Sequence, residues 1–188
     1  MPPARFAELW KRLTLGIAYA TEAHLFITNL DQSPFNVGTT ITLEDFTPEQ
    51  VADLNVRYNS PLRDDAALRA FYDLVGGHPY LVNRGLFEMA EHGLDPAAFR
   101  AQAEREQGLF GDHLRRVLVL LAQDPELLKE ARGILGGEPC RSFQNFYRLR
   151  AAGVMAGESP QDVRPRCPLY AAYLRKQLGI KGPIRGSP

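Results

Sequence analysis

The sequence contains no phosphate-binding loop of the form G-x-x-x-x-G-K-[ST], and no apolar strand ends in the acidic pair that would hold magnesium. A nucleotide-hydrolysing site that is complete in itself is therefore not expected. Cysteine is scarce too, since Cys140 and Cys167 are the only two and lie far apart without a C-x-x-C pair. Two free, partly buried thiols are predicted in place of a zinc site or a disulfide framework.

Other signals are also missing. No apolar run approaches the length of a membrane span, and the N-terminus lacks the basic-then-apolar order of a signal peptide, so a cytoplasmic protein without a membrane contact is predicted. No serine lies in a G-x-S-x-G elbow. The four histidines, His24, His78, His92 and His113, show no metal-ligand spacing. The acidic pairs at residues 44–45, 64–65 and 104–106 are predicted to be helix caps and solvated faces.

What is present is an ordinary globular composition with an uneven charge. The 188 residues are 45% apolar and 23% charged, with a net charge of zero. Residues 1–107 carry 9 Lys and Arg against 15 Asp and Glu, a net charge of −6, whereas residues 108–188 carry 13 against 7, a net charge of +6. The C-terminal portion is therefore predicted to be a separate electrostatic unit.

The first 45 residues have the pattern of a buried strand. Apolar Leu13, Leu15, Ile17 and Tyr19 alternate with small residues, which is typical of a strand covered on both faces. Such a strand needs sheet neighbours, and none of similar strength precedes it. Residues 1–45 are therefore predicted to be a remnant of a larger sheet.

Residues 46–107 predict four short helices. The first follows Thr47 and Pro48, with Gln50 completing a capping box; the second follows Asp64 or Asp65 and stops at Gly76 and Gly77. Pro79 begins the third helix, and Asp95 caps a fourth that is expected to run to about residue 107. Four helices in succession indicate a compact helical subdomain.

Residues 108–188 predict three helices, a β-hairpin and a last helix. Asp112 and Asp124 are expected to open the first two helices, and the third is expected over about 141–152. Phe143, Phe146 and Tyr147 are expected to pack into the core. A hairpin over about 154–164 and a helix over about 169–178 follow, which is the order of a winged helix.

Several motifs together resemble one protein family. They are Ala20-Thr21-Glu22, the loop from Gln32 to Gly38, the turn Gly76-Gly77-His78-Pro79-Tyr80-Leu81, and Arg166-Cys167-Pro168-Leu169-Tyr170. In this order they resemble the C-terminal two-thirds of a bacterial AAA-like, STAND-type ATPase module that lacks its P-loop and magnesium-binding region. The resemblance implies an α+β, predominantly helical chain: a strand remnant over 1–45, a helical lid over 46–107 and a winged helix over 108–188.

The resemblance also implies nucleotide contacts. Thr21 or Glu22 would sense the γ-phosphate, and the turn formed by Gly76, Gly77, His78 and Pro79 resembles the glycine-proline lid motif that approaches the nucleotide. Glycines allow close backbone approach, and a helix N-terminus favours an anion. His78 could titrate near neutrality and contact phosphate. The alternatives are that the turn is an ordinary helix cap and restart, that Thr21 only ends a strand, and that Glu22 is solvated.

The basic residues of the C-terminal portion admit two interpretations. Arg141, Arg148, Arg150, Arg164 and Arg166 lie on the predicted third helix and hairpin, where a winged helix can meet DNA. In the relatives, this domain more often packs against the nucleotide core, and the aromatic residues of the third helix leave few polar side chains for base edges. A protein-contact surface is therefore favoured over DNA.

Together these patterns predict a regulatory part of an AAA-like nucleotide switch that does not hydrolyse ATP alone. Its expected partners are the missing ATPase core or a related full-length ATPase, with a homo-oligomer as a further arrangement. ATP or ADP with magnesium would bind only in the completed module. A DNA-binding winged-helix protein is the alternative function.

Overall fold

The structure is a computed structural model that describes Thr14, Gly16, Thr39, Ile41 and residues 43–180. The apolar residues of the predicted strand over 13–19, the loop over 32–38, and Thr21 and Glu22 lie outside the described residues. The described part is predominantly helical with one two-stranded sheet, which confirms the α+β class predicted from the sequence. No helix in this part is long and apolar enough to cross a membrane.

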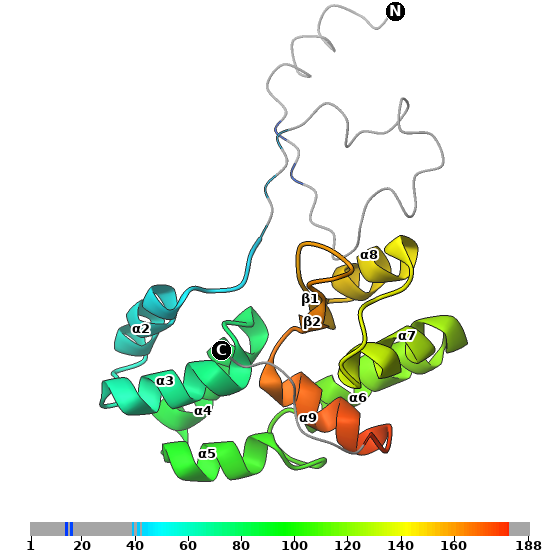
Figure 1. The fold of residues 1–188 in the computed structure, drawn as a ribbon. Helices are drawn as coiled ribbons and strands as arrows, with labels where there is room; N and C mark the ends of the chain where they lie inside the picture. The colour runs from blue at the N-terminus through cyan, green and yellow to red at the C-terminus, as the bar shows by residue number, and fades with distance from the viewer. Residues whose placement is uncertain (1–13, 15, 17–38, 40, 42, 181–188) are drawn as a thin grey trace, which may run out of the picture.

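The first helical group consists of α2 (Pro48–Arg57), α3 (Asp65–Val75), α4 (Pro79–Glu91) and α5 (Pro96–Ala103) (Figure 1). Local capping explains where these helices begin. Thr47 and Gln50 form the predicted capping box on α2, and the Asp64 and Asp95 carboxylates accept backbone N–H groups at the starts of α3 and α5.

One boundary differs from the sequence prediction. The fourth helix ends at Ala103 and does not reach residue 107. The chain turns back there: the Gly108 amide donates to the Arg105 carbonyl, and a side chain at Gly108 would collide with the Gln102 carbonyl oxygen. The turn between α5 and α6 therefore depends on a glycine at residue 108.

The second helical group consists of α6 (Gly111–Ala122), α7 (Pro125–Leu135), α8 (Phe143–Ala151), a hairpin and α9 (Pro168–Gln177). Asp124 caps α7 and Ser142 caps α8, whereas α6 begins after Phe110 without a side-chain cap. The hairpin pairs β1 (Met155–Ala156) with β2 (Arg164–Pro165) in antiparallel register, with Met155 opposite Pro165. The predicted order of helices and hairpin is therefore observed.

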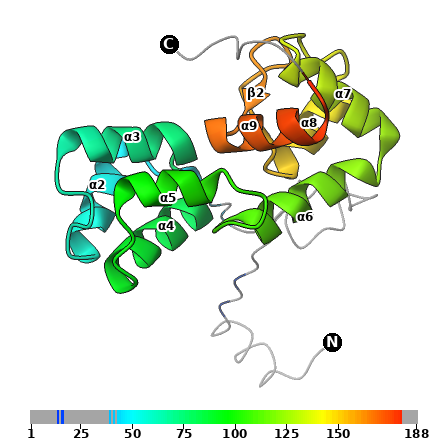
Figure 2. The ribbon, with the colours of Figure 1, turned by 90° about the horizontal axis from the view of Figure 1, so that it is seen from below.

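The last helix joins the two groups. α9 packs against α3 of the first group and against α6 and α7 of the second. Figures 1 and 2 show α9 between the two groups, with the hairpin leading directly into it. The buried core is continuous across this junction, with Phe71, Phe99 and Phe110 in successive ring contacts at centroid distances of 5.2 and 5.9 Å. The two groups therefore share one core.

Helix α8 corrects the core predicted for this region. Phe146 and Leu149 are fully buried, but Phe143 is 65% exposed and Tyr147 is 40% exposed. The buried face of α8 is formed by Phe146 and Leu149, which are three residues apart, and Phe143 and Tyr147 lie further round the helix from the centre of that face. The prediction that all three aromatic residues pack into the core was wrong for Phe143 and Tyr147.

Candidate functional site

Residues from both helical groups meet around the turn between α3 and α4. We call this region the seam, and its members are Asp45, Phe46, Gly76, Gly77, His78, His113, Arg166, Cys167 and Tyr170. The chain reaches it in four passes: before α2, between α3 and α4, at the start of α6, and between β2 and α9. The seam therefore brings together residues that are far apart in the sequence.

The two glycines of the turn allow close packing of the chain on itself. Gly76 ends α3 with a φ of 65°, and Gly77 follows with a φ of 72°, both in the left-handed region. A Cβ on Gly76 would lie 2.9 Å from the Cβ of Cys167, and one on Gly77 would collide with the carbonyl oxygen of Phe46. The Phe46 amide also donates to the Gly77 carbonyl at 2.9 Å. The close approach predicted at these glycines is made by the chain's own backbone.

His78 caps α4 with its side chain. Its Nδ1 accepts the Tyr80 amide N–H at 3.2 Å, so one of the free N–H groups expected at this helix start is already occupied. Only 8% of the residue is exposed. The ring faces the second helical group, where its Nε2 lies 3.0 Å from the Tyr170 hydroxyl.

A hydrogen-bonded chain crosses the seam from His78 through Tyr170 to His113. Because Nδ1 of His78 is an acceptor, its proton belongs on Nε2, which donates to the Tyr170 hydroxyl. That hydroxyl then donates to Nε2 of His113 at 2.6 Å. His78 caps α4, Tyr170 belongs to α9 and His113 belongs to α6. This series of hydrogen bonds therefore fixes the position of the first helical group relative to the second.

Both histidines of this chain are held in the neutral form. Burial and the nearby Arg166 charge lower the pKa of His78 to about 4. Burial, followed by the charges of Arg116 and Arg166, lowers the pKa of His113. The expectation that His78 titrates near neutrality was therefore wrong, because burial makes its charged form unfavourable.

An ion pair spans the seam beside the turn. The Arg166 guanidinium holds the Asp45 carboxylate through two bonds, with Nη2 to Oδ1 at 2.5 Å and Nε to Oδ2 at 3.1 Å. Burial opposes the charge on Arg166, but the hydrogen bonds and the charge of Asp45 outweigh it, and the pKa of Arg166 is raised. The acidic pair at residues 44–45 is thus not merely a solvated face, because Asp45 joins the segment before α2 to the residue after β2.

No nucleophile is activated in the seam. Burial raises the pKa of the Cys167 thiol to about 12, so it stays protonated. Both cysteines are free and buried. Among the residues that the structure describes, no group of three or more His, Cys, Asp or Glu side chains has the arrangement of a metal site. Beside the glycine turn, the seam therefore supplies neutral hydrogen-bonding groups and one guanidinium that is paired with a carboxylate.

Comparison with protein families identifies the chain. A family model described as an AAA-like domain matches residues 3–176. The chain belongs to this AAA-like family. No curated protein and no solved structure matches it. This match confirms the AAA-like part of the resemblance predicted from the sequence motifs, and the family model spans both helical groups, including the hairpin and nearly all of α9.

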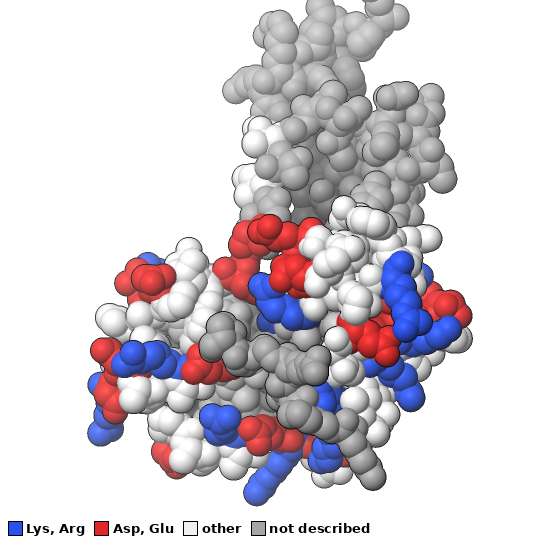
Figure 3. Space-filling model, in the orientation of Figure 1, with Lys and Arg blue, Asp and Glu red and all other residues white. Residues whose placement is uncertain are grey.

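Most of the arginines predicted to form a DNA or protein surface in this AAA-like chain are paired with acidic side chains. Four of the five are in ion pairs: Arg141 with Glu138, Arg148 with Asp124, Arg164 with Asp162 and Arg166 with Asp45. The fifth, Arg150, lies over the Phe146 ring at 5.6 Å. On the face in Figure 3, basic and acidic side chains alternate and do not form one continuous basic area.

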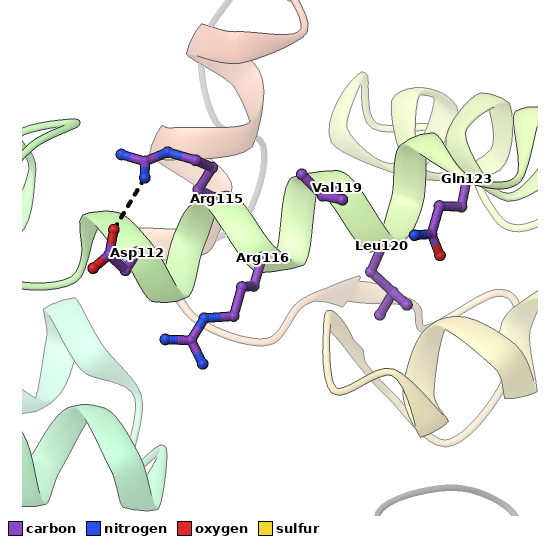
Figure 4. Close-up of a pocket in the computed structure, with 6 residues that line it drawn as sticks. All are labelled: Asp112, Arg115, Arg116, Val119, Leu120 and Gln123. Carbon is purple, nitrogen blue, oxygen red and sulfur yellow. Dashed lines mark hydrogen bonds and ion pairs between the residues drawn. The ribbon is translucent and has the colours of Figure 1, made fainter.

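A shallow groove of about 390 Å³ runs along the exposed side of α6 in this AAA-like chain (Figure 4). It is lined by Asp112, Arg115, Arg116, Val119, Leu120 and Gln123. Val119 and Leu120 are among the exposed large apolar residues, and Arg115 is paired with Asp112. None of these residues belongs to the seam.

Some residues of the seam of this AAA-like chain were singled out from the sequence as site candidates, and others were not. The sequence motifs indicated the turn over 76–79 and the segment that contains Arg166 and Tyr170, but Arg166 was assigned to a surface. Asp45 and His113 were not recognised, because their partners are 121 and 57 residues away. No local pattern in the sequence signals either contact.

Proposed function

We propose that this chain is the regulatory, non-hydrolysing part of a STAND-type AAA-like nucleotide switch. In this proposal α2–α5 are the helical lid, and α6–α8 with the hairpin are a winged helix. The lid and the winged helix respond together when a nucleotide binds, and the P-loop and magnesium carboxylates come from an ATPase core. ATP hydrolysis by this chain alone is not expected, because the sequence contains no P-loop.

The observation that carries this proposal is the seam. The glycine-proline turn, which is the motif proposed to approach the nucleotide, is bonded through His78 to Tyr170 and His113 of the second helical group. A displacement of the turn by a nucleotide would break these bonds or move the second group with it. A switch of this kind requires that the nucleotide-bound state has contacts of its own that replace these bonds.

The proposed nucleotide contacts are Thr21, Glu22 and the turn over 76–79. Thr21 and Glu22 lie outside the described residues, so their role rests on the family resemblance. In the turn, α4 starts with Pro79 at its first position, and the Cβ sides of Gly76 and Gly77 are packed against Cys167 and the Phe46 carbonyl, so a nucleotide that reaches these sides has to displace those contacts. ADP or ATP with magnesium is the ligand class in the completed module.

A protein partner is favoured over DNA for the second helical group. Ion pairs use four of the five candidate arginines, which reduces the positive field that draws proteins to phosphate backbones. The exposed residues of α8 include Phe143 and Tyr147, which suit contact with protein better than with base edges. The proposed partner is the core of an AAA-like ATPase.

Titration calorimetry with a purified P-loop core of an AAA-like ATPase tests the proposal. The chain is expected to bind this core, and saturating Mg-ADP is expected to tighten the affinity by roughly 5- to 150-fold, the usual range of coupling between two sites. The variant Gly93→Ala, which changes an exposed residue outside the seam, serves as a control. Its affinity for the core should increase with Mg-ADP as much as that of the wild type, since a methyl group on Gly93 would meet no atom from elsewhere in the described chain within 4 Å.

The alternative function is tested in parallel with a fluorescent DNA duplex. Absence of association with the core in both nucleotide states would contradict the proposal. DNA binding that weakens steeply with salt, and that is lost when Arg148 and Arg150 are both changed to Ala, would establish the winged-helix DNA binder in its place.

A further inference from the structure

The ion pair between Asp45 and Arg166 lies directly on the turn proposed to meet the nucleotide. The Arg166 carbonyl oxygen would be 3.3 Å from a Cβ on Gly76, and the amide of Phe46, the residue after Asp45, donates a backbone hydrogen bond to Gly77. The backbone at or next to each member of the pair therefore lies against the turn. Their side chains remain partly accessible, at 24% for Arg166 and 31% for Asp45.

The geometry of the pair is the one that arginine uses for phosphate. A guanidinium binds carboxylate and phosphate oxygens through the same two parallel N–H bonds, so either anion fits one guanidinium edge. The Asp45 carboxylate takes Nε and Nη2, and the remaining Nη1 lies 3.5 Å from the Gly153 carbonyl, at the limit of a hydrogen bond. The binding edge of Arg166 is therefore occupied by an anion from the chain itself.

The other groups at the turn are poorly suited to hold a phosphate. His78 is neutral, and its Nδ1 takes up the Tyr80 amide. Its Nε2 proton is committed to Tyr170. Arg166 is the cation whose charge reaches His78, so it is the group at the turn best placed to neutralise a phosphate.

We propose that Arg166 is a phosphate-binding residue of the nucleotide site and that the Asp45 carboxylate occupies it until a phosphate takes its place. This inference rests on the proposed function, because it names a contact and its regulation within the same site. The exchange releases Asp45, and with it the segment that leads into α2, from the second helical group. Phosphate binding would thereby break one ion pair between the two helical groups.

The test uses the full chain and inorganic pyrophosphate as the probe. Asp45→Asn removes the competing charge, so pyrophosphate should bind this variant on the order of ten-fold more tightly than the wild type, as followed by the arginine Nε resonances in NMR. Adding Arg166→Gln to this variant should abolish the gain. The matched control is Asp162→Asn, which removes the exposed partner of Arg164 and should leave pyrophosphate binding unchanged.

A measurement on the wild-type chain tests the inference even if Asp45→Asn does not fold. Pyrophosphate should shift the Arg166 Nε and the Asp45 carboxylate resonances of the wild-type chain together, with one common midpoint. Absence of pyrophosphate binding, equal affinities of the wild type and Asp45→Asn, or affinity that survives Arg166→Gln would each overturn the inference. If the chain still binds the ATPase core in an ADP-dependent manner, the proposed function stands and only this inference fails.

Discussion

Single residues at the seam have roles that follow from backbone geometry and burial. Gly76 and Gly77 both take left-handed conformations, but the space around them decides how much a side chain would cost. Burial lowers the pKa of His78 below the usual value for histidine, so its ring is neutral. Both ring nitrogens take part in hydrogen bonds. Both features make specific predictions.

Gly77→Ala should destabilise the chain more than Gly93→Ala does. Both positions have positive φ, which costs a non-glycine residue about 1–2 kcal/mol. At Gly77 the methyl group would also collide with the Phe46 carbonyl oxygen, which adds about 1–3 kcal/mol of overpacking, whereas Gly93 has open space. Urea unfolding of the two variants measures this difference, and equal losses of stability would show that the Phe46 contact is not tight.

His78 should make the stability of the chain dependent on pH between about 6.5 and 4. The folded pKa of about 4 lies below the unfolded value of 6.5, so the unfolded chain binds the proton first. Its contribution is complete above pH 6.5 and is lost as the pH falls, by about 3 kcal/mol at pH 4. His78→Gln should flatten this part of the stability profile relative to the wild type.

The control for this pH dependence is His92→Gln. His92 has an exposed side chain that pairs with Glu88 at the surface and lies outside the seam, so its replacement should not remove the pH dependence attributed to His78. Urea midpoints measured across the pH range give both slopes. If His78→Gln and His92→Gln have the same slope, then His78 is not held neutral by the fold.

At the scale of the elements, α9 is the helix that connects the two helical groups. It packs on α3, α6 and α7, and its Tyr170 carries the hydroxyl that lies between the two histidine rings. The hairpin positions the start of α9, and Arg166 sits in the short connection between them. The relation between the two groups therefore depends on α9 more than on any other element described.

Tyr170→Phe should loosen the contact between the groups without unfolding either. It leaves a buried donor on His78 and an acceptor on His113 without their partner, which costs about 1–3 kcal/mol. Hydrogen exchange should become faster at the first turn of α4, beginning with the Tyr80 amide. Tyr173→Phe, on the same helix but outside the seam, should not change exchange at α4, and an equal effect of both variants would argue against a specific role of the Tyr170 hydroxyl.

The elements also show which features a sequence can predict. Helix starts at Thr47, Asp64 and Asp124 and the helix end at Gly76 follow from residues within four positions of one another, and the sequence predicted all four. The orientation of α8 was not predicted, because the i, i+3, i+4 spacing of its three aromatic residues indicates one common face, whereas the core covers the side formed by Phe146 and Leu149. The Asp45 contact was missed because it depends on how distant segments pack.

At the scale of the whole molecule, the family and the seam together support one account. The AAA-like family match covers residues 3–176, and the seam joins the first helical group to α6, to α9 and to the connection between β2 and α9. In the proposed switch, nucleotide binding and association with an ATPase core are two linked equilibria. Linkage requires that each changes the other by the same factor.

Binding of fluorescent ADP to the P-loop core, measured with increasing amounts of this chain, shows whether the chain forms part of the nucleotide site. We expect the chain to tighten ADP binding to the core by the same factor by which ADP tightens binding of the core to the chain. An ADP affinity that stays the same while the chain is bound to the core would contradict the claim that this chain forms part of the nucleotide site.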